Sequence, residues 1–376
     1  MYAVYFHFVL LMRSQAAEFG LMARAVEALV SQRSERQGEG CERIPRISVA
    51  PFLTGDESAK AAVAAEWDDA CRHVGFLCVV DHGVPAGVIK ECWDASIEYF
   101  DRPLSEKIDS VQMSDEYPYG YQGFGTENLQ ASLDDDELGP GDLKEMFNIC
   151  LGSAEPAADM PTPRWPRNSA RLRAAWSAYY RALQHLSETL YRVCARALGL
   201  PESWFEDKIS RHRNSLRAIN YPGLVPPLVP RPGQVRASVH TDYGALTLLR
   251  LGGENPEGLQ VMGASGAWVD VGAGVGDGFV VNLGDLMARW TNDRWLSTPH
   301  RVVNPPSEKA ARARRQSLAY FCNVNMDVRV ECIPTCCGGE FGEPKYEPIT
   351  AGEHLMRKHQ QTVAGQLCYE GTRGRS

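Results

Sequence analysis

The feature that most constrains this chain is a series of short β-type runs in its second half, starting at residue 215. Each run is rich in β-branched or aromatic residues, and Gly, Pro, Asn or Asp separates it from the next. Closely spaced short strands with turn residues between them are typical of an all-β barrel or sandwich. We therefore predict a mainly β core with flanking helices. The runs are SLRAINY, ALTLLRL, GLQVM, AWVDV, GFVVNLGDL, RVVNP, QSLAYFCNV and VRVECI.

Helices are predicted before this β-rich part and once after it. The longest, over residues 169–198, carries an apolar residue every three or four positions, which gives one buried stripe, and Gly199 and Pro201 end it. A short apolar run at 76–80 is typical of a buried strand. The other predicted helices cover residues 59–73, 88–100 and 351–361, and a long loop covers 115–143 with an acidic, solvated run at 134–137.

Charge and cysteine content narrow the functional classes. The net charge of −8 argues against a general nucleic-acid binder, which needs a basic surface, and leaves a small-molecule enzyme open. The eleven cysteines are odd in number and irregularly spaced, so they do not predict a disulfide framework. Cys332, Cys336 and Cys337 form the one cluster, either a zinc site or scattered thiols. We expect a reducing, cytoplasmic location and a monomer.

The N-terminal residues 1–12 are apolar and uncharged. They are too few to span a bilayer, which takes about 20 residues, so no membrane association is expected. As a signal peptide they lack a basic first region. Two alternatives to a signal peptide remain: these residues are a hydrophobic extension packed on the body of the protein, or translation starts later, at Met12 or Met22. Residues 31–43 have the composition of a linker.

Two histidines and an aspartate are the candidate metal ligands. His240 and Asp242 stand two positions apart at the start of a predicted strand, so we expect them to share one face of it. His300 lies 58 residues after Asp242, at the start of another predicted strand. Two imidazoles and one carboxylate form the facial triad that holds non-haem Fe(II) and leaves three positions open. The alternative is that both histidines are ordinary polar groups at a sheet end.

Arg315 and Ser317 form a second pair two positions apart on a predicted strand. A guanidinium offers a planar fork of donors that matches a carboxylate, and the hydroxyl adds a donor on the same face. An anionic co-substrate bound to the metal needs such an anchor at its far end. Alternatively, Arg315 ends the basic run 309–315, which is then a solvated cluster.

Ten motifs occur along the chain in a fixed order: IPRISVAPFL, CRHVGFLCVVDHGVP, DLKEMFNI, PRWP, HTDYGALTLL, GLQV, WVDV, NLGDLMARWTNDRW, STPHRVVNP and RQSLAYF. Together they resemble the isopenicillin N synthase-like branch of the Fe(II)/2-oxoglutarate-dependent dioxygenases. The resemblance covers residues 44–362, and it implies a double-stranded β-helix, or jelly roll, flanked by helices. We divide the chain accordingly into 1–43 (extension and linker), 44–165 (N-terminal helix and strand segment), 166–211 (long helix and connection), 212–330 (jelly-roll core) and 331–376 (C-terminal segment).

The resemblance also assigns roles to individual residues. It implies that His240, Asp242 and His300 bind Fe(II). It implies that Arg315 and Ser317 hold the distal carboxylate of 2-oxoglutarate and that Tyr221 assists them. The family often has asparagine two residues before this tyrosine. Here that position is Ile219, with Asn220 shifted by one.

The function we predict is oxidation of a C–H bond in a small organic molecule, by hydroxylation, desaturation or cyclisation, with O2 consumed and succinate and CO2 released. The cofactor is Fe(II), with 2-oxoglutarate as co-substrate. Three alternatives stay open: an oxidase or ethylene-forming enzyme of the same fold, a zinc hydrolase, and a small-molecule-binding protein without catalysis.

Interpretations of several other residues are less specific. Lys144, Glu145 and Phe147 are candidates to face the substrate. Asn282 and Trp290 line the pocket or pack in the core. Two residues have structural explanations: Asp285 forms a turn ahead of the next element, and His82 is a turn residue.

Overall fold

The computed structural model describes residues 43–110, 119–127, 129, 141–153, 160, 162–225, 228–252, 257–272, 275–305 and 312–359. The predictions for residues 1–12, for nearly all of the linker and for the acidic run 134–137 lie outside these residues. None of the helices found within the described ranges combines the length and apolarity that crossing a membrane requires.

A large mixed sheet forms the centre of the molecule. Most neighbouring strands pair antiparallel, whereas β1 and β2 run parallel. Its central strands β7 and β12 pair over six residues each, from Ser317 opposite Leu251 to Cys322 opposite Leu246. The order across the sheet is β1 (Arg46–Ser48), β2 (Phe76–Val80), β10 (Phe279–Leu283), β7 (Leu246–Leu251), β12 (Arg315–Cys322), β5 (Ser215–Tyr221), β4 (Glu145–Ile149) and β3 (Gly120–Gln122).

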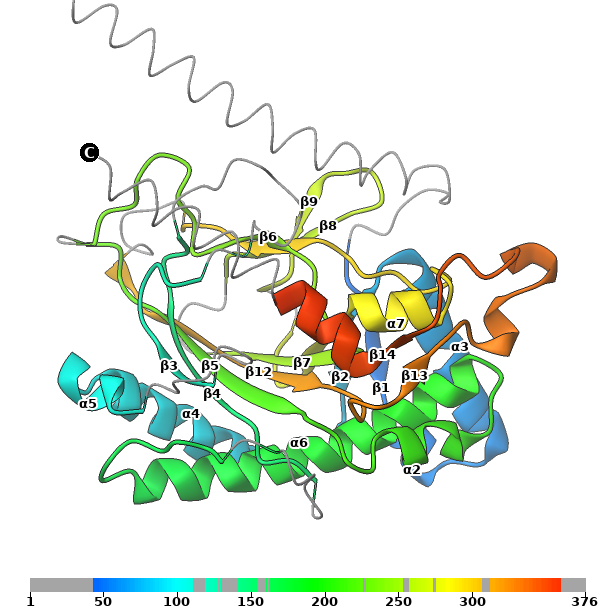
Figure 1. Ribbon diagram of the computed structural model, residues 1–376, viewed down its shortest axis with the longest axis horizontal. Helices are drawn as coiled ribbons and strands as arrows, with labels where there is room; N and C mark the ends of the chain where they lie inside the picture. Colours follow the sequence, from blue (N-terminus) through cyan, green and yellow to red (C-terminus); the bar gives the residue numbers. More distant parts are fainter. Residues whose placement is uncertain are drawn as a thin grey trace, which may run out of the picture.

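A smaller antiparallel sheet lies over one face of the large one (Figure 1). Its order is β6 (Ala237–His240), β11 (His300–Val302), β8 (Leu259–Met262) and β9 (Trp268–Asp270). The chain passes back and forth between the two sheets from β5 to β12, so short strands of both sheets end close together. A separate pair is formed by β13 (Arg329–Val330) and β14 (Ile349–Thr350).

Helices cover the other face of the large sheet, where α4 and α6 contact β5 and β12 (Figure 1). A further helical stretch runs over residues 351–359. The helices are α2 (Ala50–Thr54), α3 (Glu57–His73), α4 (Ala86–Phe100), α5 (Leu104–Ile108), α6 (Ala170–Ala197) and α7 (Asp285–Trp290). The 3-10 helices are η2 (Glu202–Lys208), η4 (Pro334–Cys336) and η5 (Gly339–Phe341).

Two apolar clusters hold these layers together. The larger one contains the predicted stripe of α6, including Trp176, Leu183 and Leu190, packed with the outer residues of the large sheet. Each such fully buried side chain stabilises the fold by about 1.5–3 kcal/mol. The smaller cluster contains Tyr221 and Val302 and lies between the sheets. The inner faces of the sheets therefore meet over a separate interior, in which the candidate site lies.

The predicted helices and most strands are confirmed, and the differences have local causes. The long loop predicted for 115–143 contains β3, and β4 was not predicted, because Lys144 and Glu145 hide the apolar part of that strand. His240 ends β6 and does not begin a strand. The helix predicted for 351–361 is confirmed over its described part.

Candidate active site

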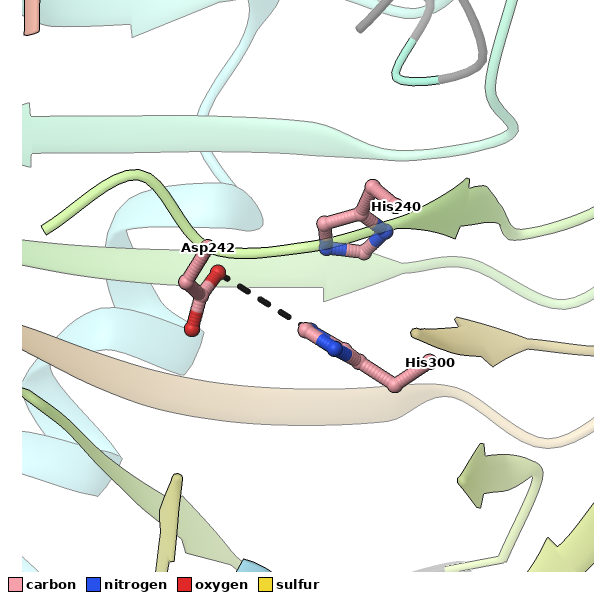
Figure 2. A group of neighbouring side chains, drawn as sticks. All are labelled: His240, Asp242 and His300. Atoms are coloured by element: carbon pink, nitrogen blue, oxygen red, sulfur yellow. Dashed lines mark ion pairs between the residues drawn. The ribbon is translucent and has the colours of Figure 1, made fainter. Parts of the chain in front are cut away.

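The three predicted metal ligands lie together between the two sheets. His240 is the last residue of β6, and His300 is the first residue of β11. These two strands are neighbours, with His240 directly opposite His300 in the register. Asp242 follows two residues after β6, and Figure 2 shows its carboxylate facing the His300 ring. The sheet pairing thus joins two histidines that are 60 positions apart in the sequence.

The geometry of these side chains fits a single metal ion. One potential ligand atom from each of the three residues lies within 4.8 Å of the others. Nε2 of His300 is 3.8 Å from Oδ1 of Asp242, and the two imidazole centroids are 4.2 Å apart. Among the described residues no other group of His, Cys, Asp or Glu side chains has such geometry, and this includes Cys332, Cys336 and Cys337.

Backbone carbonyls orient both imidazoles. Nδ1 of His240 lies 2.7 Å from the carbonyl of Ser238, and Nδ1 of His300 lies 3.1 Å from that of Thr298. A carbonyl can only accept, so each Nδ1 carries the proton and each Nε2 keeps a lone pair for a metal. Burial, and then the nearby His300, lowers the pKa of His240 well below its usual range. The ring is therefore neutral, as a metal ligand must be.

Asp242 is fixed through the carboxylate oxygen that faces away from His300. Its Oδ2 accepts hydrogen bonds from Thr247 (2.6 Å) and Asn282 (2.7 Å). Burial alone would raise the pKa of this carboxyl, but His300, His240 and the two donors outweigh burial and lower it. Gly284 packs close against this loop, because a Cβ there would lie 2.8 Å from the carbonyl oxygen of Asp242. The glycine of the NLGD motif therefore permits the ligand loop to approach.

The same cavity contains the predicted co-substrate residues at its other end. Arg315 stands opposite Tyr221 in the register of β12 and β5, and its guanidinium lies 4.8 Å from the centre of that ring. Nε of Arg315 donates to the carbonyl of Glu257 at 3.0 Å, whereas Nη1 is buried without a partner. Ser317 points to the same side one pleat further along. A buried unpartnered guanidinium nitrogen fits a site for a carboxylate.

A network of buried charges forms another wall of the cavity. Nζ of Lys144 lies 2.8 Å from carboxylate oxygens of both Asp142 and Glu127, and Arg217 lies 3.3 Å from Glu127. Burial opposes ionisation here, but Lys144 and Arg217 outweigh it and lower the pKa of Glu127 to about 2. The charges of the two cations and the two carboxylates cancel. This wall can therefore offer a ligand hydrogen bonds but no net charge.

This network also reaches His240, one of the predicted metal ligands. Oδ1 of Asp142 accepts from the backbone N–H of Ser238 at 3.0 Å and from its hydroxyl at 2.7 Å. The carbonyl of the same Ser238 orients His240. Lys144, Asp142 and Ser238 therefore hold the position of His240 through successive hydrogen bonds.

The less specific predictions have mixed outcomes. Lys144 lines the cavity as expected. Glu145 and Phe147 do not, because alternate residues of β4 face opposite sides: Glu145 accepts from Lys107 and Tyr121, and Phe147 packs on aromatic rings beneath the sheet. Asn282 lines the cavity, whereas Trp290 is in the core.

The remaining residues in this group behave as predicted. Asn220 faces away and donates to Glu145, so Ile219 occupies the cavity position. Asp285 begins α7, and His82 accepts from the N–H of Val84 in its turn.

Several cavity residues were not predicted. Glu127 and Arg217 carry the wall charges, and Phe321 lies 5.2 Å below the Arg217 guanidinium. Tyr243 and His359 meet edge to face, with centroids 5.5 Å apart, where the 351–359 helix closes one side. The alternation of β5 and β12 would have revealed Arg217 and Phe321, since both lie on the cavity side of strands already predicted. Glu127 and His359 had no such signal.

Comparison with known proteins gives two family matches that follow this architecture. The pattern described as "non-haem dioxygenase in morphine synthesis N-terminal" matches residues 44–168. The pattern of the 2OG-Fe(II) oxygenase superfamily matches residues 213–324, which include all six predicted site residues.

Individual proteins match along most of their length. The chain is 30% identical to the 2-oxoglutarate-Fe(II) type oxidoreductase hxnY of Emericella nidulans, over 87% of this chain and 92% of the relative. It is 30% identical to the homoarginine-6-hydroxylase 2-ODD-233 of Oryza sativa subsp. japonica, over 85% and 98%. Among solved structures, it is similar to full-length Neurospora crassa T7H in complex with alpha-KG and thymine, with a TM-score of 0.73, 30% identity and coverage of 85% and 97%.

Proposed function

Since this chain belongs to the 2OG-Fe(II) oxygenase superfamily, we propose that it oxidises a C–H bond of a small organic molecule, by hydroxylation, desaturation or cyclisation. It is an oxidoreductase that uses Fe(II) and 2-oxoglutarate. When bound, this pair activates O2 and releases succinate and CO2 as the substrate is oxidised. The observation that carries the proposal is the convergence of His240, Asp242 and His300 in one cavity with Arg315.

His240, Asp242 and His300 are the proposed Fe(II) ligands. In support, both imidazoles present a lone pair on Nε2, because their Nδ1 atoms donate to carbonyls. The carboxylate of Asp242 has donors on Oδ2 and keeps Oδ1 toward the imidazoles. This donor set of two nitrogens and one oxygen suits Fe(II), and three ligands leave positions for a chelating co-substrate and O2.

Arg315, Ser317 and Tyr221 are the proposed residues for the distal carboxylate of 2-oxoglutarate. Their role is to orient the co-substrate by charge-assisted hydrogen bonds, with the buried Nη1 of Arg315 as the main donor. Apolar side chains of Leu249 and Leu259 line the same region and exclude water from it.

The wall that carries Glu127, Lys144 and Arg217 is the proposed side for the organic substrate. These charges are neutralised within the wall, so they offer oriented donors and acceptors and bring no net charge. Of the three proteins named above, one is called a homoarginine-6-hydroxylase and one was solved in complex with thymine, and both compounds are small polar molecules. A small polar substrate is therefore the class to test first.

We also infer that β5 to β12 form the predicted jelly roll and that the chain is one catalytic unit, in keeping with its alternation between sheets. Strands β5, β7, β10 and β12 belong to the large sheet, and β6, β8, β9 and β11 to the small one. This alternation is the arrangement expected for a double-stranded β-helix of eight strands.

The experiment is a screen of small polar molecules for substrate-dependent succinate formation from 2-oxoglutarate under air with Fe(II). We expect at least one compound to stimulate turnover, and His240→Ala to abolish it. Product formation that does not depend on 2-oxoglutarate would contradict the proposal and favour an oxidase. The exposed His185→Ala serves as the matched control and should retain activity.

A further inference from the structure

Two buried arginines share one tyrosine ring at the co-substrate end of the cavity. Arg236 and Arg315 are each 1% exposed. Their guanidinium carbons lie 6.0 and 4.8 Å from the centre of the Tyr221 ring. Arg236 directly precedes β6 and was not singled out in the sequence, whereas Arg315 begins β12. The fold thus adds a second positive charge to the predicted Arg315 and Ser317 pair.

Neither guanidinium forms an ion pair with a carboxylate in the described part of the chain. Nη2 of Arg236 donates to the carbonyls of Ala313 (3.2 Å) and Pro222 (3.4 Å), and its Nε is buried without a partner. Arg315 donates to one carbonyl and keeps Nη1 unpartnered. Carbonyl dipoles therefore solvate these cations only in part.

The contrast with the opposite wall is informative. Lys144 is also buried and Arg217 is mostly buried, and both have carboxylates within 3.3 Å. Isolated buried cations destabilise a fold unless a counter-charge compensates them. Burial, and then the charge of Arg315, lowers the pKa of Arg236 to about 10, which still leaves it charged at neutral pH. An anionic ligand is the compensation that this end of the cavity lacks.

We propose that Arg236 is a positioning residue that supports Tyr221 and Arg315 and adds positive charge, so that the site selects 2-oxo acids with a distal carboxylate over those without one. This inference rests on the proposed function. Arg236 does not line the cavity itself, so it acts through the tyrosine ring and through its field. The purely structural alternative is that Arg236 only ties together two backbone carbonyls.

The test compares 2-oxoglutarate with 2-oxobutyrate, which lacks the distal carboxylate. Dissociation constants are measured by isothermal titration calorimetry on the Co(II)-loaded, full-length protein and on Arg236→Met. We expect Arg236→Met to weaken 2-oxoglutarate binding about tenfold and to leave 2-oxobutyrate binding unchanged. Arg236→Lys keeps the charge and should restore most of the preference. Arg211→Met removes an exposed arginine and should change neither constant.

Equal weakening of both oxo acids by Arg236→Met would assign a structural role to Arg236 and overturn the proposal. Unchanged binding of both would overturn it as well. Failure of the proposed function has a different signature, because the wild-type protein would then bind 2-oxoglutarate no better than 2-oxobutyrate.

Discussion

Asp142→Asn tests the buried charge network that supports His240. The side chains of Asp142 and Lys144 are 1% and 3% exposed, and the carboxylate accepts two hydrogen bonds from Ser238 as well as the contact from Lys144. An amide cannot serve both sides, because it has a single acceptor oxygen. The substitution also leaves two cations facing only Glu127. Breaking a buried pair in this way costs about 3–5 kcal/mol, so we expect the free energy of unfolding to fall by that amount.

The assay is urea unfolding of the metal-free protein, and a double variant makes it specific. In Asp142→Asn/Lys144→Met the remaining Glu127 and Arg217 balance each other, so we expect more than half of the lost stability to return. Asp207→Asn removes a carboxylate from an exposed pair and should cost less than about 0.5 kcal/mol. The reasoning is refuted if Asp142→Asn is as stable as wild type, or if the double variant is no more stable than the single one.

The other predictions concern pH, the metal and the core. The pKa of Glu127 is lowered to about 2 from an ordinary 4.5, which stabilises the folded protein by about 3 kcal/mol above pH 4.5. This stabilisation is lost as the pH falls from 4.5 toward 2. The difference in free energy of unfolding between wild type and Glu127→Gln, measured with urea, should therefore shrink over this interval. Thr247→Val removes a donor to Asp242 and should weaken Co(II) binding at least about tenfold in a spectroscopic titration, whereas unchanged affinity would contradict that role. Trp290→Ala should lower stability by about 3–5 kcal/mol and leave the KM for 2-oxoglutarate unchanged; a raised KM would place Trp290 in the site.

Local sequence patterns were sufficient for most of the fold. The runs that became β5, β7, β8, β10 and β12 alternate or cluster apolar residues between turn residues, and the structure has strands there. The stripe of α6 has helical period because one face packs on the large sheet. Such patterns involve residues close together in the sequence, so they can be recognised without knowledge of the tertiary structure.

The candidate site was predictable to the extent that short spacing encodes it. His240 and Asp242 are two residues apart, and so are Arg315 and Ser317. Pairing between strands then places His300 opposite His240 and Tyr221 opposite Arg315.

The supporting residues gave no comparable signal. Glu127 belongs to an irregular segment, and Asp142 precedes a strand whose first residues are charged. Arg236 is a single basic residue between a turn and β6. Apart from Lys144, which follows Asp142 by two residues, their partners are distant in the sequence, and no local pattern indicates that pairing.

The most direct test of the account is an anaerobic absorption titration with Fe(II) and 2-oxoglutarate. The proposal that His240, Asp242 and His300 hold Fe(II) where 2-oxoglutarate chelates it predicts a visible charge-transfer band in the wild-type protein. Asp242→Ala should give no band, and Arg315→Met should require a higher concentration of 2-oxoglutarate for the same band. Absence of the band in wild type, or an undiminished band in Asp242→Ala, would contradict the account.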